Sequence, residues 1–164
     1  MRVLLVDYTG TGVDGLIVTA GFQPRAVLIQ RRPTVRQLTL KTTSMGGENS
    51  HTYALGYATN RIKTLTSSGC TLGTGLPVNE NTISYTAIFL GEDTILGVGT
   101  YTGDGLDNRD ISSGTTTGLA AGLTLIVRED TTTWMSRLGS QTGDLSQSMW
   151  LLQEAAANQI QSQS

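Results

Sequence analysis

The apolar residues of this chain come in short runs, and their spacing constrains the fold more than any other feature of the sequence. The runs occupy residues 2–6, 16–19, 26–29, 82–90, 95–98 and 123–127. Clusters of Gly, Pro, Asn, Asp or Ser separate them. Short β-branched or aliphatic runs with such punctuation are typical of strands in an all-β domain. We therefore expect an all-β fold. Apolar and hydroxylated side chains alternate along 82–90, so one face of that strand can lie on a core.

Two segments favour helices instead. In 144–161, apolar residues recur every three or four positions, at Met149, Leu152, Ala156 and Ile160. Asp144 is suited to the N-cap of this helix, and Gln147 follows three residues later, as in a capping box. The segment 50–63 carries a weaker version of the pattern, interrupted by Gly56. We predict a short helix in each segment.

The sequence also contains an internal duplication. Four blocks recur in the same order, pairing 8–14 with 101–107, 27–31 with 124–128, 47–50 with 143–146, and 59–63 with 157–161. We therefore expect two related β-sandwich-like units, 1–94 and 95–164, each with a short helix. The second unit has no counterpart of 69–90, so its sheet lacks closing strands. Three explanations are open: these strands come from the first unit, from a neighbouring chain, or from polypeptide beyond Ser164.

The apolar runs supply the predicted cores. In the first unit the core residues are Val3, Leu5, Ile17, Val27, Ile29, Ile83, Tyr85, Ile88 and Phe89. In the second unit they are Leu123, Leu125, Val127, Trp134, Met149, Leu152 and Ile160. Cys70 has no His or Lys close in sequence to activate it, so we expect a buried thiol with a packing role.

Both tryptophans are expected to be buried in the core or in a subunit interface. Trp134 and Trp150 lie beside Met135, Met149 and Leu151 in the sequence. Large aromatic side chains flanked by apolar residues contribute buried area to cores and subunit interfaces. The candidate interface residues are therefore Trp134, Met149, Trp150 and Leu151.

The composition excludes several classes of partner. Only 15% of the residues are charged, the formal net charge is -2, and Lys plus Arg number 11. The chain thus lacks the basic patch that binds nucleic acid or an anionic membrane surface. With a single Cys the chain cannot form an internal disulfide, and with a single Cys and a single His it has few ways to build a usual metal site. No apolar run approaches the roughly 20 residues of a membrane helix, and 3–6 is too short for the core of a signal peptide. We expect no cofactor, no nucleic acid and no membrane among its partners.

Two candidate sites have simpler structural interpretations. Gly10, Gly12 and Gly15 match the G-x-G-x-x-G pattern, but a dinucleotide site needs a helix to follow the glycines. The following 16–19 run is β-branched, so we expect a tight hairpin turn with positive φ. His51 has no nucleophile-elbow serine near it, so we expect a surface or turn position rather than a catalytic one.

Four segments carry motifs that occur together in one known family. They are Tyr8-Thr9-Gly10-x-Gly12, Gly21-Phe22-Gln23-Pro24-x-x-Val27-Leu28-Ile29, Ser67-Ser68-Gly69-x-Thr71-Leu72-Gly73, and Val78-Asn79 followed by Tyr85. Their order resembles a β-rich domain of tailed-bacteriophage virion proteins, which reads YTGNGT, GFQPDLVIIK, DGFTLG and VNxxGxxY. The chain departs from it at Arg25, where Asp is usual, at Cys70, where Phe is usual, and at 117–120, where G-F-x-P is expected. The resemblance implies a virion location and a structural role, with no catalytic residues.

The expected function is that of a non-enzymatic virion structural protein, and within that class a capsid decoration or cement protein. Such a protein stabilises the head by many modest contacts. Its expected partners are further copies of itself, in a trimer for example, and virion proteins such as the major capsid protein. A tail, fibre or baseplate component is the first alternative. A host-glycan-binding module that stacks sugars on Tyr53, Tyr57 or Trp134 is the second, and a glycan hydrolase is the third.

Overall fold

The computed structural model describes residues 2–32, 37–91, 96–103, 123–128, 134–138 and 147–148. Its strands are β1 (Val3–Thr9), β2 (Leu16–Thr19), β3 (Pro24–Arg31), β4 (Leu38–Thr42), β5 (Ser50–Thr52), β6 (Gly56–Ala58), β7 (Ile62–Thr66), β8 (Gly69–Leu72), β9 (Ser84–Gly91), β10 (Leu123–Val127), β11 (Trp134–Leu138) and β12 (Gln147–Ser148). The helix α1 (Leu76–Asn79) is the only helix among the described residues. All strand pairs are antiparallel, so the expectation of an all-β fold is confirmed.

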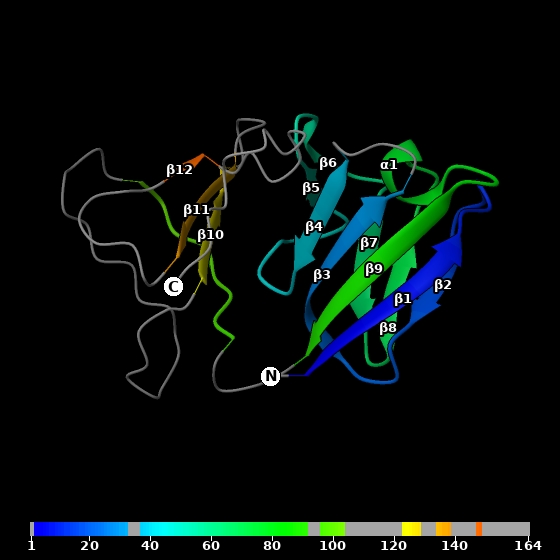
Figure 1. The fold of residues 1–164 in the computed structure, drawn as a ribbon, viewed down its shortest axis with the longest axis horizontal. Helices are drawn as coiled ribbons and strands as arrows, with labels where there is room; N and C mark the ends of the chain where they lie inside the picture. The colour runs from blue at the N-terminus through cyan, green and yellow to red at the C-terminus, as the bar shows by residue number, and fades with distance from the viewer. Residues whose placement is uncertain are drawn as a thin grey trace, which may run out of the picture.

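A six-stranded sheet forms the centre of the structure. Its strand order is β1-β9-β3-β4-β5-β6, and Figure 1 shows β1 in dark blue at its margin beside β9. The β1 and β9 strands pair along their whole length, from Val3 opposite Leu90 to Thr9 opposite Ser84. On the other side of β9, β3 continues the sheet, with Ile29 opposite Ala87. The two long partners of β9 therefore come from the first 31 residues of the chain.

The main core lies between this sheet and a three-stranded sheet of order β2-β8-β7. We call the face of the six-stranded sheet that meets this core its inner face. The inner face contributes Val27, Ile29, Tyr85 and Phe89 to this core, and all four are fully buried. From the smaller sheet come Val18, Ile62, Cys70 and Leu72. The predicted burial of Cys70 is thus confirmed, and β-strand alternation explains why every second residue of β3 and β9 reaches this core.

The opposite, outer face of the six-stranded sheet contacts a third sheet of order β10-β11-β12. Figure 1 shows these three strands on the side of the molecule where β4 and β5 lie. Trp134 of β11 is fully buried and packs in one cluster with Ala26, Leu38 and Leu40. Leu125 and Val127 of β10 are partly buried in the same cluster. The expected burial of Trp134 is therefore confirmed, in a contact between two sheets.

The two predicted helices are wrong where the structure describes them. In 50–63 the chain forms β5, β6 and the start of β7, and Ala54 (φ 63°) and Gly56 (φ 73°) reverse its direction between β5 and β6. Cross-strand pairing with β4 and a left-handed turn thus outweigh the weak helical pattern. In 144–161 Gln147 and Ser148 pair with β11 as β12, and the remainder lies outside the described residues. The 95–98 run also fails as a strand, because its described residues 96–98 have no regular structure.

The predicted core of the first unit is partly wrong. Val3, Leu5 and Ile17 are 43%, 62% and 63% exposed. Each belongs to a strand at a sheet edge and alternates with a more buried neighbour, so its side chain faces away from the main core. Ile83 is partly buried against the main core, and Ile88 lies on the outer face at intermediate exposure. In the second unit, the side chains of Leu123, Met149, Leu152 and Ile160 lie outside the described residues.

Candidate assembly surface

The strand β1 forms an edge of the six-stranded sheet. Among the described residues it pairs with β9 alone. Its sequence Val-Leu-Leu-Val-Asp-Tyr-Thr contains no Gly or Pro that would interrupt pairing. An edge strand of this kind presents a row of N–H and C=O groups to which another strand can bond. β1 is therefore a candidate surface for assembly.

The register shows which backbone groups of β1 point to the open edge. The N–H of Gly91 donates to the carbonyl oxygen of Arg2 (2.7 Å), and the N–H of Gly10 donates to that of Ile83 (2.8 Å). In an antiparallel ladder, residues that bond to the partner strand alternate with residues that do not. Even-numbered residues of β1 therefore bond to β9. The N–H and C=O groups of its odd-numbered residues, Val3, Leu5, Asp7 and Thr9, point to the open edge.

Side chains of the same odd-numbered residues lie on the outer face. Val3 is opposite Leu90, and Leu5 is opposite Ile88, and directly opposed residues share a face. Val3 and Leu5 are 43% and 62% exposed. We call Val3, Leu5 and Ile88 the edge strip. It combines exposed apolar side chains with unpaired backbone groups, which are the two requirements for adding a strand.

A polar cluster ends the edge strip at Asp7. The Thr86 hydroxyl donates to a carboxylate oxygen of Asp7 (2.8 Å), and Nε of Arg32 donates to the Thr86 hydroxyl (2.9 Å). Arg32 also forms an ion pair with Asp7. The Thr86 hydrogen bond and then the Arg32 guanidinium lower the pKa of Asp7. The carboxylate therefore stays charged at neutral pH and divides an apolar half of β1 from a polar half.

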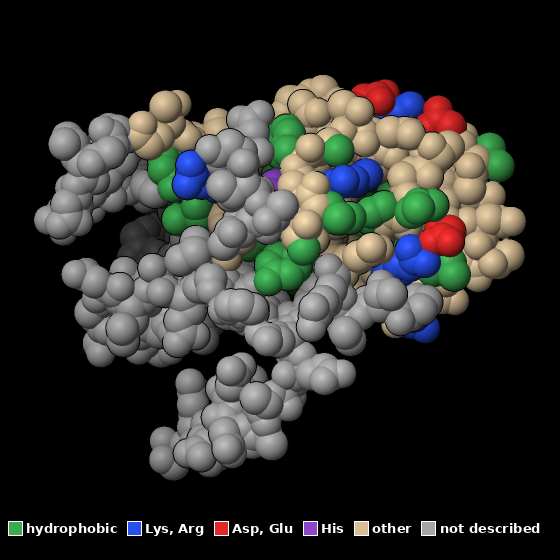
Figure 2. All heavy atoms as spheres, turned by 90° about the horizontal axis from the view of Figure 1, so that it is seen from above, with side chains coloured by type: hydrophobic (Ala, Val, Ile, Leu, Met, Phe, Trp, Pro, Cys, Tyr) green, Lys and Arg blue, Asp and Glu red, His purple; other side chains and the backbone are tan. Residues whose placement is uncertain are grey.

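Several charges elsewhere on the described surface are also paired. Figure 2 shows acidic and basic side chains lying close together rather than in a patch of one sign. Lys63 contacts both Asp14 and Glu48, each at 3.2 Å, and Arg31 pairs with Glu80. Within the part of the chain that the structure describes, the apolar edge strip differs from this mixed surface.

The glycine-rich loop after β1 is held by Asn79. Gly12 (φ 70°) and Gly15 (φ 85°) confirm the predicted positive φ, but the predicted hairpin is wrong because β1 and β2 belong to different sheets. The Asn79 side-chain oxygen accepts from the N–H of Thr11 (2.8 Å). Its amide nitrogen donates to the carbonyl of Val13 (2.8 Å). Since Asn79 is fully buried, these bonds close the loop over the end of the core.

Trp134 and His51 form a buried contact. Nε1 of Trp134 donates to Nδ1 of His51 (2.6 Å), and both side chains are fully buried. The predicted surface or turn position of His51 is therefore wrong. The sequence signal was weak, because the polar segment 50–52 does not show the apolar alternation that predicts a buried strand. The other candidate interface residues, Met149, Trp150 and Leu151, lie outside the described residues.

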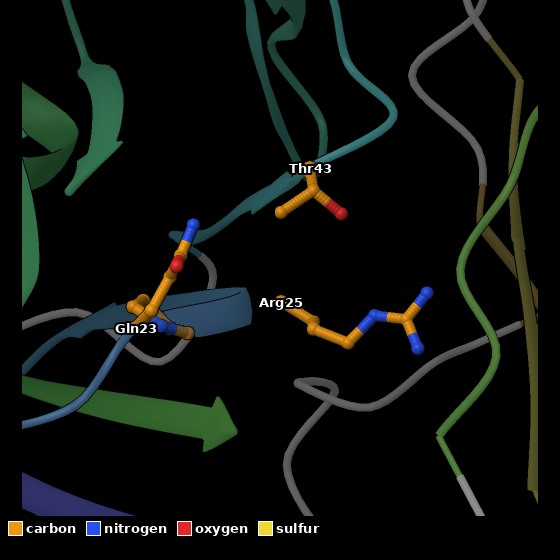
Figure 3. A pocket seen from close by; sticks show the side chains of 4 residues that line it. Gln23, Arg25 and Thr43 are labelled. Carbon is orange, nitrogen blue, oxygen red and sulfur yellow. The ribbon is translucent and has the colours of Figure 1, made fainter. Parts of the chain in front are cut away.

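A shallow cavity of about 160 Å³ lies beside the start of β3. It is lined by Gln23, Pro24, Arg25 and Thr43, and Figure 3 shows the Arg25 side chain extended away from Gln23 and Thr43. Nη1 of Arg25 donates to the carbonyl oxygen of Leu96 (3.0 Å). Among the described lining residues Arg25 is the only ionisable one, and this bond ties it to the chain that follows β9. Those described residues do not supply the paired acid and base that proton transfer would need.

The described residues also bear on metal, thiol and membrane chemistry. Burial raises the pKa of the Cys70 thiol to about 12, so it is a neutral packing group near neutral pH. In the described ranges, no three His, Cys, Asp or Glu side chains lie close enough together to hold a metal ion. No helix within those ranges is long and apolar enough to span a membrane.

The geometry thus favours β1 over the cavity as a functional surface. It offers exposed apolar side chains, an open row of backbone groups and a charged end. No family model, curated protein or solved structure matches the chain.

Proposed function

We propose that this chain is a non-enzymatic structural protein of a tailed-phage virion, and within that class a capsid decoration or cement protein. Its partners would be further copies of itself and virion proteins such as the major capsid protein. The observation that carries the proposal is the open β1 edge with its exposed Val3 and Leu5. An edge that offers both backbone bonds and apolar contact is suited to assembly between chains.

The contacts of the family-like motifs support a structural role for them. The first and last motifs are about 70 residues apart in the sequence, yet they meet in space. The Tyr8 hydroxyl donates to the carbonyl of Val78 (2.6 Å), and its ring stacks on Tyr85 with 5.2 Å between ring centroids. Asn79 closes the loop that contains Gly10 and Gly12. These residues are used to hold one end of the fold together, as expected of motifs that specify a fold rather than a reaction.

The third sheet is formed by residues of the proposed second unit. We keep the proposal of two duplicated, β-sandwich-like units, 1–94 and 95–164. The duplicated blocks 27–31 and 124–128 both contain strand residues, of β3 and β10. Trp134 of the second unit packs on the outer face of the first unit's sheet. This contact is face-to-face packing, and among the described residues no strand of 1–94 pairs with β10, β11 or β12, so it does not choose among the three explanations for the missing strands.

The same geometry bears on the alternatives. Trp134 is fully buried, so its ring is not available to stack on a sugar. Tyr53 lies edge-on to Trp134, and Tyr57 lies edge-on to His51. These contacts give the rings a packing role, but Tyr53 and Tyr57 are of intermediate exposure, so only Trp134 meets the burial that would dispose of glycan binding. A tail, fibre or baseplate location uses the same assembly edge and is separated from a head location by experiment.

The experiment locates the chain in particles. Phage particles made by a host that carries this sequence are purified, heads and tails are separated, and the chain is quantified in each by mass spectrometry. Many copies per head support a decoration protein. Copies confined to tails overturn the head assignment in favour of the tail alternative. Absence from purified particles overturns the virion proposal as a whole.

A further inference from the structure

We infer that β1 pairs with β1 of a second copy, antiparallel and across a two-fold axis centred on Leu5. This inference rests on the proposed assembly function, because it names the partner of the edge described above. It joins two six-stranded sheets into one continuous sheet. The strand order places β1 at the margin, so this addition displaces no pairing among the described residues.

The backbone of β1 is self-complementary. The open groups belong to its odd-numbered residues, and a two-fold pair requires the same residues to bond in both copies. Centring on Leu5 sets Leu5 against Leu5 and Val3 against Asp7. All of these are odd-numbered, so each opposed pair exchanges both N–H and C=O bonds.

The side chains select this register among the alternatives. A pair centred on Asp7 sets two carboxylates directly opposite each other, which destabilises a sheet. Centring on Val6 or on Leu5 sets an apolar residue against each carboxylate, but that residue is Leu5 (62% exposed) in the first case and the less exposed Val3 (43%) in the second. Centring on Leu4 sets Val3 against Leu5 but pairs only residues 2–6 of the described strand, compared with residues 2–8 when the pair is centred on Leu5. Centring on Leu5 brings together the Leu5 side chains of the two copies, and Leu5 is the most exposed apolar residue of the strand. The two Asp7 residues then lie at opposite ends of the pair, each still paired with Arg32 of its own chain. Apolar contact at the centre and charge at the ends thus favour one register.

The wild-type chain and a cysteine variant test the pairing. Opposed residues that bond to each other in an antiparallel pair have Cα atoms about 5.5 Å apart, within the range that a disulfide spans. Leu5→Cys should therefore form a disulfide-linked dimer under mild oxidation, seen on a non-reducing gel. The native Cys70 is fully buried, so it does not compete. Ile17→Cys is the control, because Ile17 is equally exposed (63%) in a strand at the edge of another sheet.

A charge variant gives an independent readout. The wild-type chain should be a dimer by native mass spectrometry, and Leu5→Lys should be a monomer because two ammonium groups would be opposed. Ile17→Lys should stay a dimer. Circular dichroism of each variant checks that the fold is kept, and both sites are exposed enough for it to be kept.

Several outcomes would overturn the inference. They are a monomeric wild-type chain, a trimer, a dimer that survives in Leu5→Lys, or equal cross-linking of Leu5→Cys and Ile17→Cys. A chain that is found on heads but does not dimerise through β1 leaves the proposed function standing without this interface. A β1 dimer that is absent from particles leaves the interface standing and refutes the virion proposal.

Discussion

The indole N–H of Trp134 donates a hydrogen bond to Nδ1 of His51, and neither side chain is exposed to solvent. His51 lies in β5 of the six-stranded sheet, and Trp134 lies in β11 of the third sheet. Because Nδ1 accepts, the neutral imidazole carries its proton on Nε2. This bond therefore connects two sheets and requires one form of the histidine ring.

Replacing His51 with Phe should lower the free energy of unfolding by about 1–3 kcal/mol. The ring shape is retained, but the buried N–H of Trp134 is left without its acceptor. The measurement is urea denaturation followed by far-ultraviolet circular dichroism. Adding Trp134→Phe to this variant removes the unsatisfied donor, so the two substitutions together should cost less than the sum of their separate effects. Strict additivity of the two substitutions would contradict the role assigned to the bond.

Asn79→Asp should destabilise the chain by at least about 2 kcal/mol. The substitution keeps the shape of the side chain but removes the amide hydrogens that bond to the carbonyls of Val13 and Gly73. It also places a carboxylate against those carbonyls in a fully buried position. The matched control is Asn81→Asp at an exposed neighbouring site, with an expected change within about 0.5 kcal/mol. Equal effects at the two positions in urea denaturation would show that Asn79 does not anchor the loop.

Gly10→Ala should also destabilise the fold, for a steric reason. A Cβ atom at Gly10 would overlap the backbone carbonyl oxygen of Glu80, which cannot rotate away as a side chain could. Gly46→Ala is the control, because nothing lies within 4 Å of a Cβ built there. Thermal unfolding should show a clearly lower midpoint for Gly10→Ala and little change for Gly46→Ala. A Gly10→Ala midpoint equal to that of the wild-type chain would mean that the loop and the α1 end separate easily.

Alkaline pH should destabilise the chain in part through Cys70. Burial raises the pKa of this thiol from 9.0 to about 12, so the folded chain keeps the proton over a range in which the unfolded chain loses it. The stabilisation is therefore complete below about pH 9 and is lost as the pH rises towards about 12. Cys70→Ala should show a shallower fall in the free energy of unfolding over this window. Burial and then the neighbouring Cys70 raise the pKa of Tyr8, so the difference between the two curves contains the Cys70 thiol together with its effect on Tyr8. Parallel curves would contradict the assignment.

The sequence predicted those strands whose side chains are apolar or alternate clearly. The 16–19 run is β2, 123–127 is β10, and the alternating 82–90 run overlaps β9 from Ser84 to Leu90. Pro24 is the first residue of β3, a position that a strand tolerates for proline. The burial of Cys70 and Trp134 also followed from residue type and neighbours. These predictions rested on the local hydrophobic pattern and on residue types that are usually buried.

Other elements depend on contacts that no local pattern contains. β5 is polar throughout, and its burial comes from the Thr39–Thr52 hydroxyl contact (2.8 Å) and the His51–Trp134 bond. Lys41 is 3% exposed because its ammonium donates to the carbonyls of Gly47 (2.9 Å) and Asn49 (2.7 Å). Such polar burial is satisfied by partners that the fold brings together. The exposure of Leu5 could not be predicted from the local pattern either, because only the strand order shows that β1 lies at the edge of its sheet.

The pairing of β1 with β9 also sets the order of events during synthesis. Val3 cannot take its place in the sheet until its partner Leu90, 87 residues later in the chain, has been synthesised. At a synthesis rate of about 5–20 residues per second, that delay is about 4–17 s. Of the strands that the structure describes, β1 is synthesised first, yet it can be placed in its sheet only after β9. A nascent chain that stops before β9 leaves Val3 and Leu5 without their place in a sheet, so truncated products of this protein should be retained by chaperones or degraded.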